Sequence, residues 1–284
     1  MNLTSRLALL LTLALTPPAS AQILVAEDGP VVYGHHHLAV SDVEAHRKFW
    51  IETLGGAPAT VGAGTTEAIA FPNVFLLLRP QAPSGGTKGS TVNHIGFSVP
   101  NLRQVLDRVT ANGFRIVTRE EVAATQAVEN GIAVLGPTAA IAFVMGPDDV
   151  KVELVESRTQ TLPIALHHVH FFGPQNAEMR AWYAKVFGAT PRGGAGAFVS
   201  AALPGVTLNF TTSPDPVVGT RGRALDHIGF EIDNLEAFCK RLEAEGIPLS
   251  VSYRQVPQSD IWIAFVTDPW GTSIELSEGL DLIK

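Results

Sequence analysis

Histidines gather at four points of the sequence. The chain has nine histidines, and all but one stand in short apolar segments with the character of strands. These are His35, His36, His37, His94, His167, His168, His170 and His227. Histidines scattered over a surface would not cluster in this way, so we expect a shared chemical role. The ninth, His46, lies in a helical stretch and is expected on its solvated face.

Two glutamates stand among apolar neighbours late in the chain, Glu153 in Val152–Leu154 and Glu275 in Ile274–Leu276. A carboxylate that faces an interior is costly unless it is paired, hydrogen-bonded or bound to a metal. Two histidines and one glutamate can hold a divalent ion and leave positions open for substrate, water or dioxygen. The pattern therefore predicts metal sites. The competing interpretation is a set of hydrogen-bonded interior residues without a metal.

The sequence contains a tandem repeat, which organises these residues. The segment Asn93–Phe97 recurs as Asp226–Phe230, and His35–His37 corresponds at the same spacing to His168–His170. The offset between equivalent residues of the two copies is smaller near the ends of the copies, so the second copy lacks part of a loop. The copies are expected to form two domains, residues 31–157 and 164–278.

Each copy divides again into two similar units. In each unit a strand with a histidine leads into a helix, and short β-branched or apolar runs follow. Helices are expected before Trp50, over 101–112, before Tyr183 and over 234–245. Asn101 and Asn234 are suited to the N-caps, and Gly113 and Gly246 to the C-terminal ends. This order predicts an α+β fold of four βαβββ modules.

Equivalent positions in the repeat select the candidate ligands. His35 and His168 lie at the same distance before an aromatic pair, and His94 and His227 at the same distance before a helix cap. We therefore expect one triad in each copy. The first triad is His35, His94 and Glu153, and the second is His168, His227 and Glu275.

His37 and His170 follow the first candidate ligand of each copy by two residues, so strand alternation directs them to the same side. Each could act as a general acid or base with a pKa near the working pH, or as an outer hydrogen-bond partner of the site. A packed histidine with a structural role is the alternative.

The repeated modules, their histidines and the Asp268–Gly271 turn before Glu275 resemble the vicinal oxygen chelate superfamily. That family includes glyoxalase I, methylmalonyl-CoA epimerase, fosfomycin- and bleomycin-resistance proteins and extradiol dioxygenases. The resemblance implies that two modules form one glyoxalase-like domain around a divalent ion, which could be Zn, Fe(II), Mn or Ni. It also implies that the six residues of the two triads are the metal ligands. Gly146–Asp149 matches the turn less well, which favours the second copy as the main site.

The sequence departs from particular members of this family. Phe265 stands where extradiol dioxygenases have a tyrosine, and residues 255–261 contain no histidine, which argues against ordinary catechol cleavage. Only Asn209 could supply the fourth ligand of a standard glyoxalase I. Asn209, Trp270 and Arg221 are candidate substrate contacts near the mouth of the second site, with surface or packing roles as the alternative.

The N-terminus has the features of an export signal. Arg6 precedes an apolar run over residues 7–16, and Ala19–Ala21 supplies small residues for cleavage before Gln22. The mature chain is therefore expected to be periplasmic or secreted. The apolar run is too short to span a bilayer, and the mature chain has no predicted membrane span. Cys239, the single cysteine, lies on a helical apolar stripe and is expected in the core.

Charge limits the partners. A net charge of -7 provides no basic surface for nucleic acid, so a small molecule is the expected partner. The sequence predicts an exported metal-dependent enzyme of the glyoxalase or dioxygenase type, which chelates neighbouring oxygens of a small organic substrate. The alternative is a non-catalytic ligand-sequestering protein like the bleomycin-resistance members. Substrate, metal, reaction and oligomeric state stay open.

Overall fold

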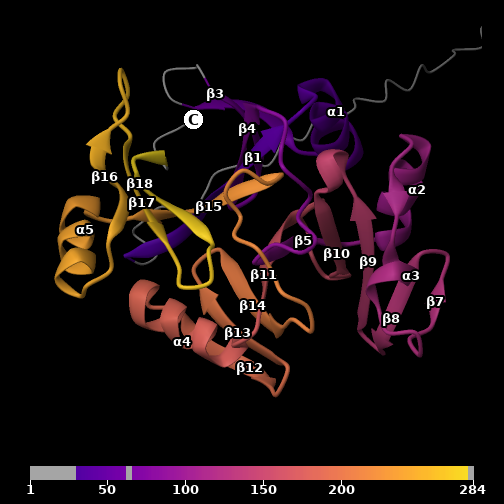
Figure 1. The fold of residues 1–284 in the computed structure, drawn as a ribbon. Coiled ribbons are helices and arrows are strands. Elements are labelled where there is room, and N and C mark those ends of the chain that lie inside the picture. The colour runs from indigo at the N-terminus through magenta and orange to yellow at the C-terminus, as the bar shows by residue number, and fades with distance from the viewer. Residues whose placement is uncertain (1–29, 62–65, 281–284) are drawn as a thin grey trace, which may run out of the picture.

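The computed structural model describes residues 30–61 and 66–280, and the predicted signal peptide lies outside them (Figure 1). The fold is α+β and contains the four expected βαβββ modules. Within the described residues, no helix is both long enough and apolar enough to cross a membrane.

The first and second modules make up the first copy of the repeat. The first consists of β1 (Val31–Val40), α1 (Val43–Arg47) with a π-helical continuation (Lys48–Thr53), β2 (Ala57–Val61), β3 (Thr66–Phe71) and β4 (Val74–Pro80). The second consists of β5 (Val92–Val99), α2 (Leu102–Ala111), β6 (Arg115–Ile116), α3 (Thr118–Glu121), β7 (Val128–Glu129), β8 (Ile132–Gly136), β9 (Ala139–Met145), a 3₁₀ turn (Pro147–Asp149) and β10 (Lys151–Glu156).

The third and fourth modules make up the second copy. The third consists of β11 (Ala165–Gly173), α4 (Asn176–Phe187), β12 (Thr190–Ala195), β13 (Phe198–Leu203) and β14 (Val206–Thr212). The fourth consists of β15 (Leu225–Ile232), α5 (Leu235–Ala244), β16 (Leu249–Gln255), β17 (Trp262–Thr267) and β18 (Ser273–Glu278).

Local sequence explains where α2 and α5 begin and end. The side chains of Asn101 and Asn234 each accept a backbone N–H of the first helical turn at 3.1 Å. Gly113 and Gly246 follow the helices with φ of 85° and 78°, a region that L side chains rarely adopt. The predicted caps are confirmed.

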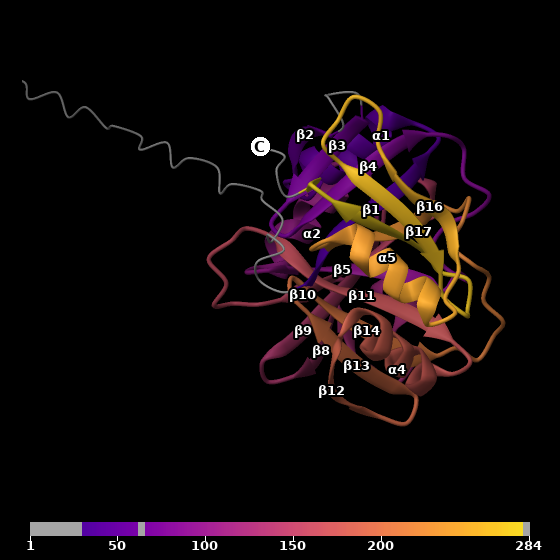
Figure 2. The ribbon, with the colours of Figure 1, turned by 90° about the vertical axis from the view of Figure 1, so that its left-hand side faces the viewer.

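The modules pair between the two copies, not within them. An eight-stranded sheet has the order β16-β17-β18-β15-β1-β4-β3-β2, so it joins the first and fourth modules. The path of the ten-stranded sheet runs β12-β13-β14-β11-β5-β10-β9-β8-β7, with β6 paired to β9, and it joins the second and third modules. Figure 2 shows the first sheet above the second. The two modules of each copy therefore lie in different sheets, and each sheet contains strands of both copies.

Two loops that join modules across the sheets are bonded to each other. Residues 81–91 connect the first and second modules, and residues 213–224 connect the third and fourth. The N–H of Thr91 donates to the carbonyl of Val218 at 2.9 Å, and the N–H of Ala224 donates to that of Gly85 at 2.9 Å. Each loop leads from one sheet to the other. The hydrogen bonds between the loops therefore lie where the chain of each copy passes between the sheets.

A buried threonine in each of these loops holds a glutamate-bearing strand. The Thr87 hydroxyl accepts the N–H of Lys151 at 3.0 Å, where β10 begins. The equivalent Thr220 accepts the N–H of Ser273 at 3.0 Å, where β18 begins. The repeated threonines therefore fix the strands that carry Glu153 and Glu275.

In each copy, aromatic side chains from the first helix form hydrogen bonds that reach an aspartate in the turn before the last strand of that copy. Trp50 donates to His46 Nδ1 at 3.1 Å, and His46 Nε2 is 3.0 Å from Asp148 Oδ2. In the second copy the hydroxyl of Tyr183 donates directly to Asp268 Oδ2 at 3.1 Å. His46 is fully buried, so its expected place on a solvated helix face is wrong. The reason is that its ring fills the space between α1 and the turn before β10.

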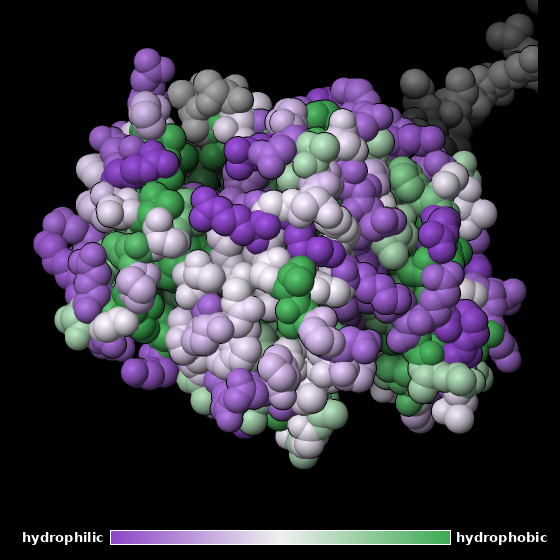
Figure 3. Space-filling view, in the orientation of Figure 1, coloured by the Kyte–Doolittle hydropathy of each residue, from purple (hydrophilic) through white to green (hydrophobic). Residues whose placement is uncertain are grey.

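The helices cover the outer faces of the sheets, as Figure 1 shows for α5 and α2 at opposite edges of the molecule. Cys239 on α5 is buried in the core, as predicted. Figure 3 shows hydrophilic residues and residues of intermediate hydropathy over most of this face, with hydrophobic residues among them.

Replacing Tyr183 with Phe removes a donor to the buried carboxylate of Asp268, which also accepts two backbone N–H groups of its turn. We expect the free energy of unfolding to fall by about 2 kcal/mol, the usual contribution of a hydrogen bond to a charged group. Urea denaturation measures the change. Tyr253→Phe is the control, because the hydroxyl of Tyr253 forms no hydrogen bond within the described residues; an equal loss in both variants would contradict the prediction.

Candidate metal centres

Histidine and glutamate side chains form two groups, one on each sheet. The first, named the His35 cluster, contains His35, His227 and Glu275. The second, named the His94 cluster, contains His94, Glu153, His168 and His170. Within each cluster one potential ligand atom per residue lies within 4.8 Å of all the others.

The His35 cluster joins three neighbouring strands, β1, β15 and β18. Glu275 Oε2 lies 3.1 Å from His35 Nε2 and 2.8 Å from His227 Nε2. All three residues are buried, and His35 is completely inaccessible. His37, on β1, contributes Nδ1 at 2.9 Å from His227 Nε2.

The His94 cluster repeats this arrangement on β5, β10 and β11. Glu153 Oε2 lies 2.9 Å from His94 Nε2 and 3.2 Å from His168 Nε2. The fourth member, His170, places Nδ1 at 3.1 Å from His94 Nε2. In both clusters, therefore, two imidazole nitrogens face one carboxylate oxygen.

The grouping of these residues corrects the sequence prediction. His35 lies with His227 and Glu275, and His168 lies with His94 and Glu153. The expected triads each lay within one copy, so the prediction placed His35 in the triad where His168 lies and His168 in the triad where His35 lies. The physical reason is the strand pairing, because β1 is hydrogen-bonded to β15 and β11 to β5.

A glycine lies under one histidine ring in each cluster. Gly229 is in register with both His35 and Glu275, and a Cβ at Gly229 would lie 2.0 Å from His35 Cε1. Gly96 has the same place beneath His168, with a separation of 2.1 Å. The absence of a side chain lets the ring cross the middle strand and reach the glutamate. Neither glycine was predicted as part of a site, although both occur in the repeated His-Ile-Gly-Phe segment.

A polar side chain orients the second histidine of each cluster. Asp226 Oδ1 lies 2.6 Å from His227 Nδ1, and Asn93 Oδ1 lies 2.9 Å from His94 Nδ1. Both residues directly precede the histidine in the repeat, which is the signal that could have identified them. Such outer partners fix the ring and leave the other nitrogen available to a metal.

The donors of the His35 cluster suit a divalent cation. Asp226 accepts hydrogen bonds only, so His227 Nδ1 carries a proton. His227 Nε2, which faces Glu275, then either carries a second proton or presents a lone pair to an ion. Neighbouring ligands that each lie about 2.1 Å from one metal are separated by about 3 Å, close to the spacing of these atoms.

Hydrogen bonds between the charged groups of the His35 cluster shift the pKa values of His227 and Glu275. Burial lowers the pKa of His227, but the hydrogen bonds to Asp226 and Glu275 more than offset it, so this pKa lies above its ordinary value. Burial raises the pKa of Glu275, and the hydrogen bonds to His227 and His35 reverse the effect and hold it well below its ordinary value. The two carboxylates thus stabilise positive charge on the ring between them.

His37 and His170 are neutral at neutral pH. Burial and the neighbouring His227 lower the pKa of His37 to about 3. Burial and the neighbouring His94 and His168 hold the pKa of His170 well below its ordinary value. Both shifts lead away from the pKa near the working pH that we considered from the sequence, because neither ring is freely solvated.

A cavity of about 160 Å³ adjoins the His35 cluster. Its polar wall is formed by His35, His37, Thr66 and Glu275, and its other lining residues are Val61, Leu77, Val256, Ile261, Ile263 and Leu280. A small molecule in this cavity would present polar atoms to the cluster and the rest of its surface to an apolar wall.

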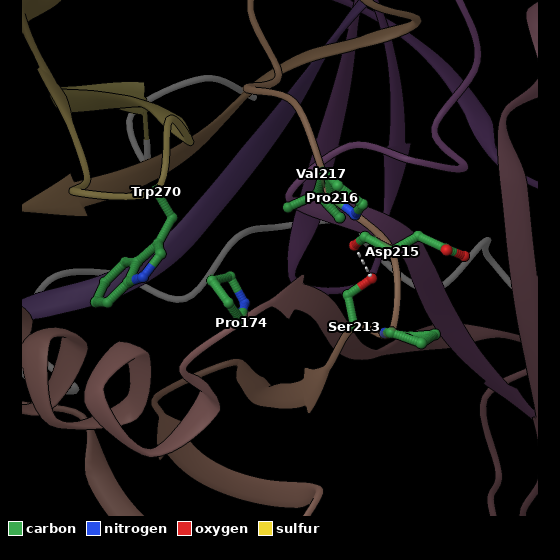
Figure 4. A pocket seen from close by; sticks show the side chains of 7 residues that line it. Pro174, Ser213, Asp215, Pro216, Val217 and Trp270 are labelled. Carbon is green, nitrogen blue, oxygen red and sulfur yellow. Dashed lines mark hydrogen bonds between the residues drawn. The ribbon is translucent and has the colours of Figure 1, made fainter.

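The three candidate substrate contacts do not line this cavity. Asn209 lies on β14 in register with His170, on the sheet of the His94 cluster. Arg221 is exposed in the loop over 213–224. Trp270 donates to Gln175 Oε1 at 3.2 Å and lines a separate hollow of about 480 Å³ with Pro174 and residues 213–217 (Figure 4). Their expected position at the mouth of the second site depended on the grouping of modules that the strand pairing contradicts.

Comparisons with known proteins agree with this architecture. The model of the Glyoxalase/Bleomycin resistance protein/Dioxygenase superfamily matches residues 32–154 and 165–276. Glyoxalase I from Zea mays is similar in structure, with a TM-score of 0.66 and 16% identity over 89% of this chain and 94% of that chain. A candidate dioxygenase from Bacillus subtilis has a TM-score of 0.63 and 14% identity, over 87% and 84% of the two chains. At such identities the likeness shows the fold. Among curated proteins, no sequence matches this chain.

Replacing Gly229 with Ala tests the crossing of His35 over β15. The new methyl group would overlap the His35 ring, so the ring must leave Glu275. We expect the free energy of unfolding of the metal-free protein to fall by about 1–3 kcal/mol, as overpacking usually causes. Urea denaturation in the presence of chelator measures it.

Gly34→Ala on the neighbouring strand is the matched control, because its Cβ would meet no atom closer than 3.4 Å. It should change stability by less than about 1 kcal/mol. A Gly229→Ala protein as stable as Gly34→Ala would show that the ring does not need the glycine.

Proposed function

The chain belongs to the glyoxalase/bleomycin resistance protein/dioxygenase superfamily, and on that premise we propose that it is a metal-dependent enzyme of the glyoxalase or dioxygenase type. The proposed active site is the His35 cluster, with His35, His227 and Glu275 as the ligands of a divalent ion. The proposed substrate is a small organic molecule with two neighbouring oxygens that chelate the ion.

One observation carries the proposal. Two buried imidazole nitrogens face the same carboxylate oxygen at 2.8 and 3.1 Å, directly beside a cavity. Without a cation the cluster needs an additional proton on His227, between Asp226 and Glu275. With a divalent ion, both nitrogens become neutral donors and the cavity gives access to the remaining coordination positions. A bound metal would supply Lewis acidity, which stabilises negative charge on substrate oxygens.

Other residues of the chain have defined parts in this proposal. Asp226 orients His227 through the hydrogen bond at Nδ1. The apolar wall of the cavity excludes water from the substrate. His37 lines the cavity, and its Nε2 has no hydrogen bond to the described residues, so we assign this nitrogen as a hydrogen-bond partner of the substrate.

The ligand set is compatible with Zn, Fe(II), Mn or Ni, and intrinsic affinity favours zinc over iron(II). Phe265 packs against His227 with ring centroids 5.1 Å apart and brings no hydroxyl to the site. Both points support an isomerase or lyase reaction over dioxygen insertion.

Replacing Glu275 with Gln tests the metal and the activity together. We expect the variant to lose one equivalent of metal, measured by elemental mass spectrometry on protein prepared without chelator or metal resin. Turnover should fall by about 1000-fold or more, because metal Lewis acidity contributes several kcal/mol. The assay is a panel of α-hydroxycarbonyl, thiol-adduct and catechol substrates, followed by product formation and oxygen consumption.

Glu278→Gln, at the end of the same strand, is the control, because Glu278 accepts the N–H of Leu235 and is not in the cluster. His37→Leu should keep the metal and lose about 10-fold of the turnover, because it removes one hydrogen bond to the substrate. If Glu275→Gln binds ligands as tightly as the unchanged protein and neither protein holds metal at this cluster, the chain is a ligand-sequestering protein instead.

We also propose that the protein is exported. The support is the charged start, the apolar run over 7–16 and the small residues Ala19–Ala21. Expression of the full chain in a bacterial host should yield a mature protein that begins at Gln22 and fractionates with the periplasm or medium. Mass spectrometry of the intact protein checks the cleavage. A mature protein that keeps residues 1–21 would contradict the proposal, and Ala21→Phe, which places a large residue at the site, should block the cleavage.

A further inference from the structure

The two clusters are equivalent in the repeat but differ in the number of side chains that converge. Only the His94 cluster gathers four residues whose potential ligand atoms are mutually within 4.8 Å. We propose that it is a closed metal site with a structural role, in which three imidazoles and one carboxylate hold a zinc-type ion and His170 is the fourth ligand. This inference goes beyond the proposed function, since it concerns a different cluster and does not depend on catalysis.

Every imidazole of the His94 cluster has its remote nitrogen engaged outside the cluster. His94 Nδ1 lies 2.9 Å from Asn93 Oδ1, and His168 Nδ1 lies 2.8 Å from His167 Nδ1. His170 Nε2 lies 2.7 Å from the hydroxyl oxygen of Thr211. Metal-bound histidines typically have such a partner, because it fixes the ring and its tautomer.

The nitrogens that remain point toward one another. His94 Nε2 and His168 Nε2 lie 2.9 and 3.2 Å from Glu153 Oε2, and His170 Nδ1 lies 3.1 Å from His94 Nε2. His168 is nearly inaccessible, and its Nε2 has no hydrogen bond within the described residues, although Glu153 Oε2 is 3.2 Å away. A buried nitrogen that faces a carboxylate without a hydrogen bond is suited to coordinate a cation.

The His35 cluster lacks most of these outer partners. Gly34 stands at the position equivalent to His167, and Arg79 at the position equivalent to Thr211. His35 Nδ1 consequently has no hydrogen-bond partner within the described residues. His37, the equivalent of His170, lines cavities. All three imidazoles of the His94 cluster thus have an outer hydrogen-bond partner, whereas the His35 cluster adjoins a cavity.

Charge around the His94 cluster permits a divalent ion. The nearest buried cation is Lys151, two residues before Glu153, and its Nζ lies 2.5 Å from Glu121 Oε2. Glu121 Oε1 also accepts from Lys88 at 3.1 Å. Lys88 is exposed to solvent, so Glu121 chiefly compensates the buried ammonium of Lys151, and the carboxylate of Glu153 remains to balance an ion. Four nitrogen and oxygen ligands in a closed set are typical of structural zinc.

The position in the fold explains the structural role. Glu153 and His94 belong to the first copy, whereas His168 and His170 belong to the second. An ion at this point would bind β11 to β5 and β10, where the two copies meet in the ten-stranded sheet. Binding that exists only in the folded chain stabilises it.

Metal release from zinc-loaded mature protein tests the inference. With an excess of a chromogenic chelator we expect two equivalents, one released rapidly and one slowly. His170→Ala should accelerate the slow release by about 10-fold or more and lower the unfolding temperature of the zinc-loaded protein only. Thr211→Val, which removes only the outer partner, should act in the same direction. Because Thr211→Val is the smaller change, its result distinguishes loss of a ligand from a folding defect in His170→Ala.

His37→Ala is the matched control at the equivalent position and should leave the slow release unchanged. With cobalt(II) in place of zinc, the slow site should show the intense visible absorption of a four-coordinate ion. Slow release that is the same in His170→Ala and Thr211→Val as in the unchanged protein, or a weak six-coordinate cobalt spectrum, would overturn the inference. Glu275→Gln affects the rapid equivalent alone, so the proposed function and this inference fail by different results.

Discussion

The pairing of β1 with β15, and of β11 with β5, is the constraint on which both sites depend. In each pair a histidine ring crosses a glycine of the neighbouring strand to reach a glutamate on the strand beyond. A side chain on Gly229 or Gly96 would occupy the place of the ring. A shift of one residue in the register would turn the histidine to the opposite face of the sheet. The chemistry of the site therefore requires this strand order, this register and these glycines together.

The same pairing makes the two copies interdependent. Each cluster takes residues from both copies, so neither copy holds a complete triad alone. The loops over 81–91 and 213–224 are hydrogen-bonded to each other and also hold β10 and β18 through Thr87 and Thr220. The contacts between the two copies that form the sheets thus also bring the members of each cluster together.

The two clusters have similar members, but different residues stand at equivalent positions around them. Asp226 behind His227 adds a negative charge that Asn93 behind His94 lacks. Thr211 and His167 restrain the rings of the His94 cluster, while Arg79 and Gly34 stand in their places at the His35 cluster. The ligands alone would suggest two equal sites. The outer partners and the cavity favour a division between an open site and a closed one.

The sequence by itself determined the repeat, the four modules and the helix caps, because periodicity and capping act locally. Polar residues among apolar neighbours also indicated the six histidines and glutamates as candidate metal ligands. It could not determine which modules share a sheet, since the duplicated strands have equivalent patterns and each could pair with either partner. Tertiary structure alone decided that His35 meets Glu275 and His168 meets Glu153. It also placed Trp270 and Arg221 away from the cavity and buried His46, because contacts between distant segments decide these positions.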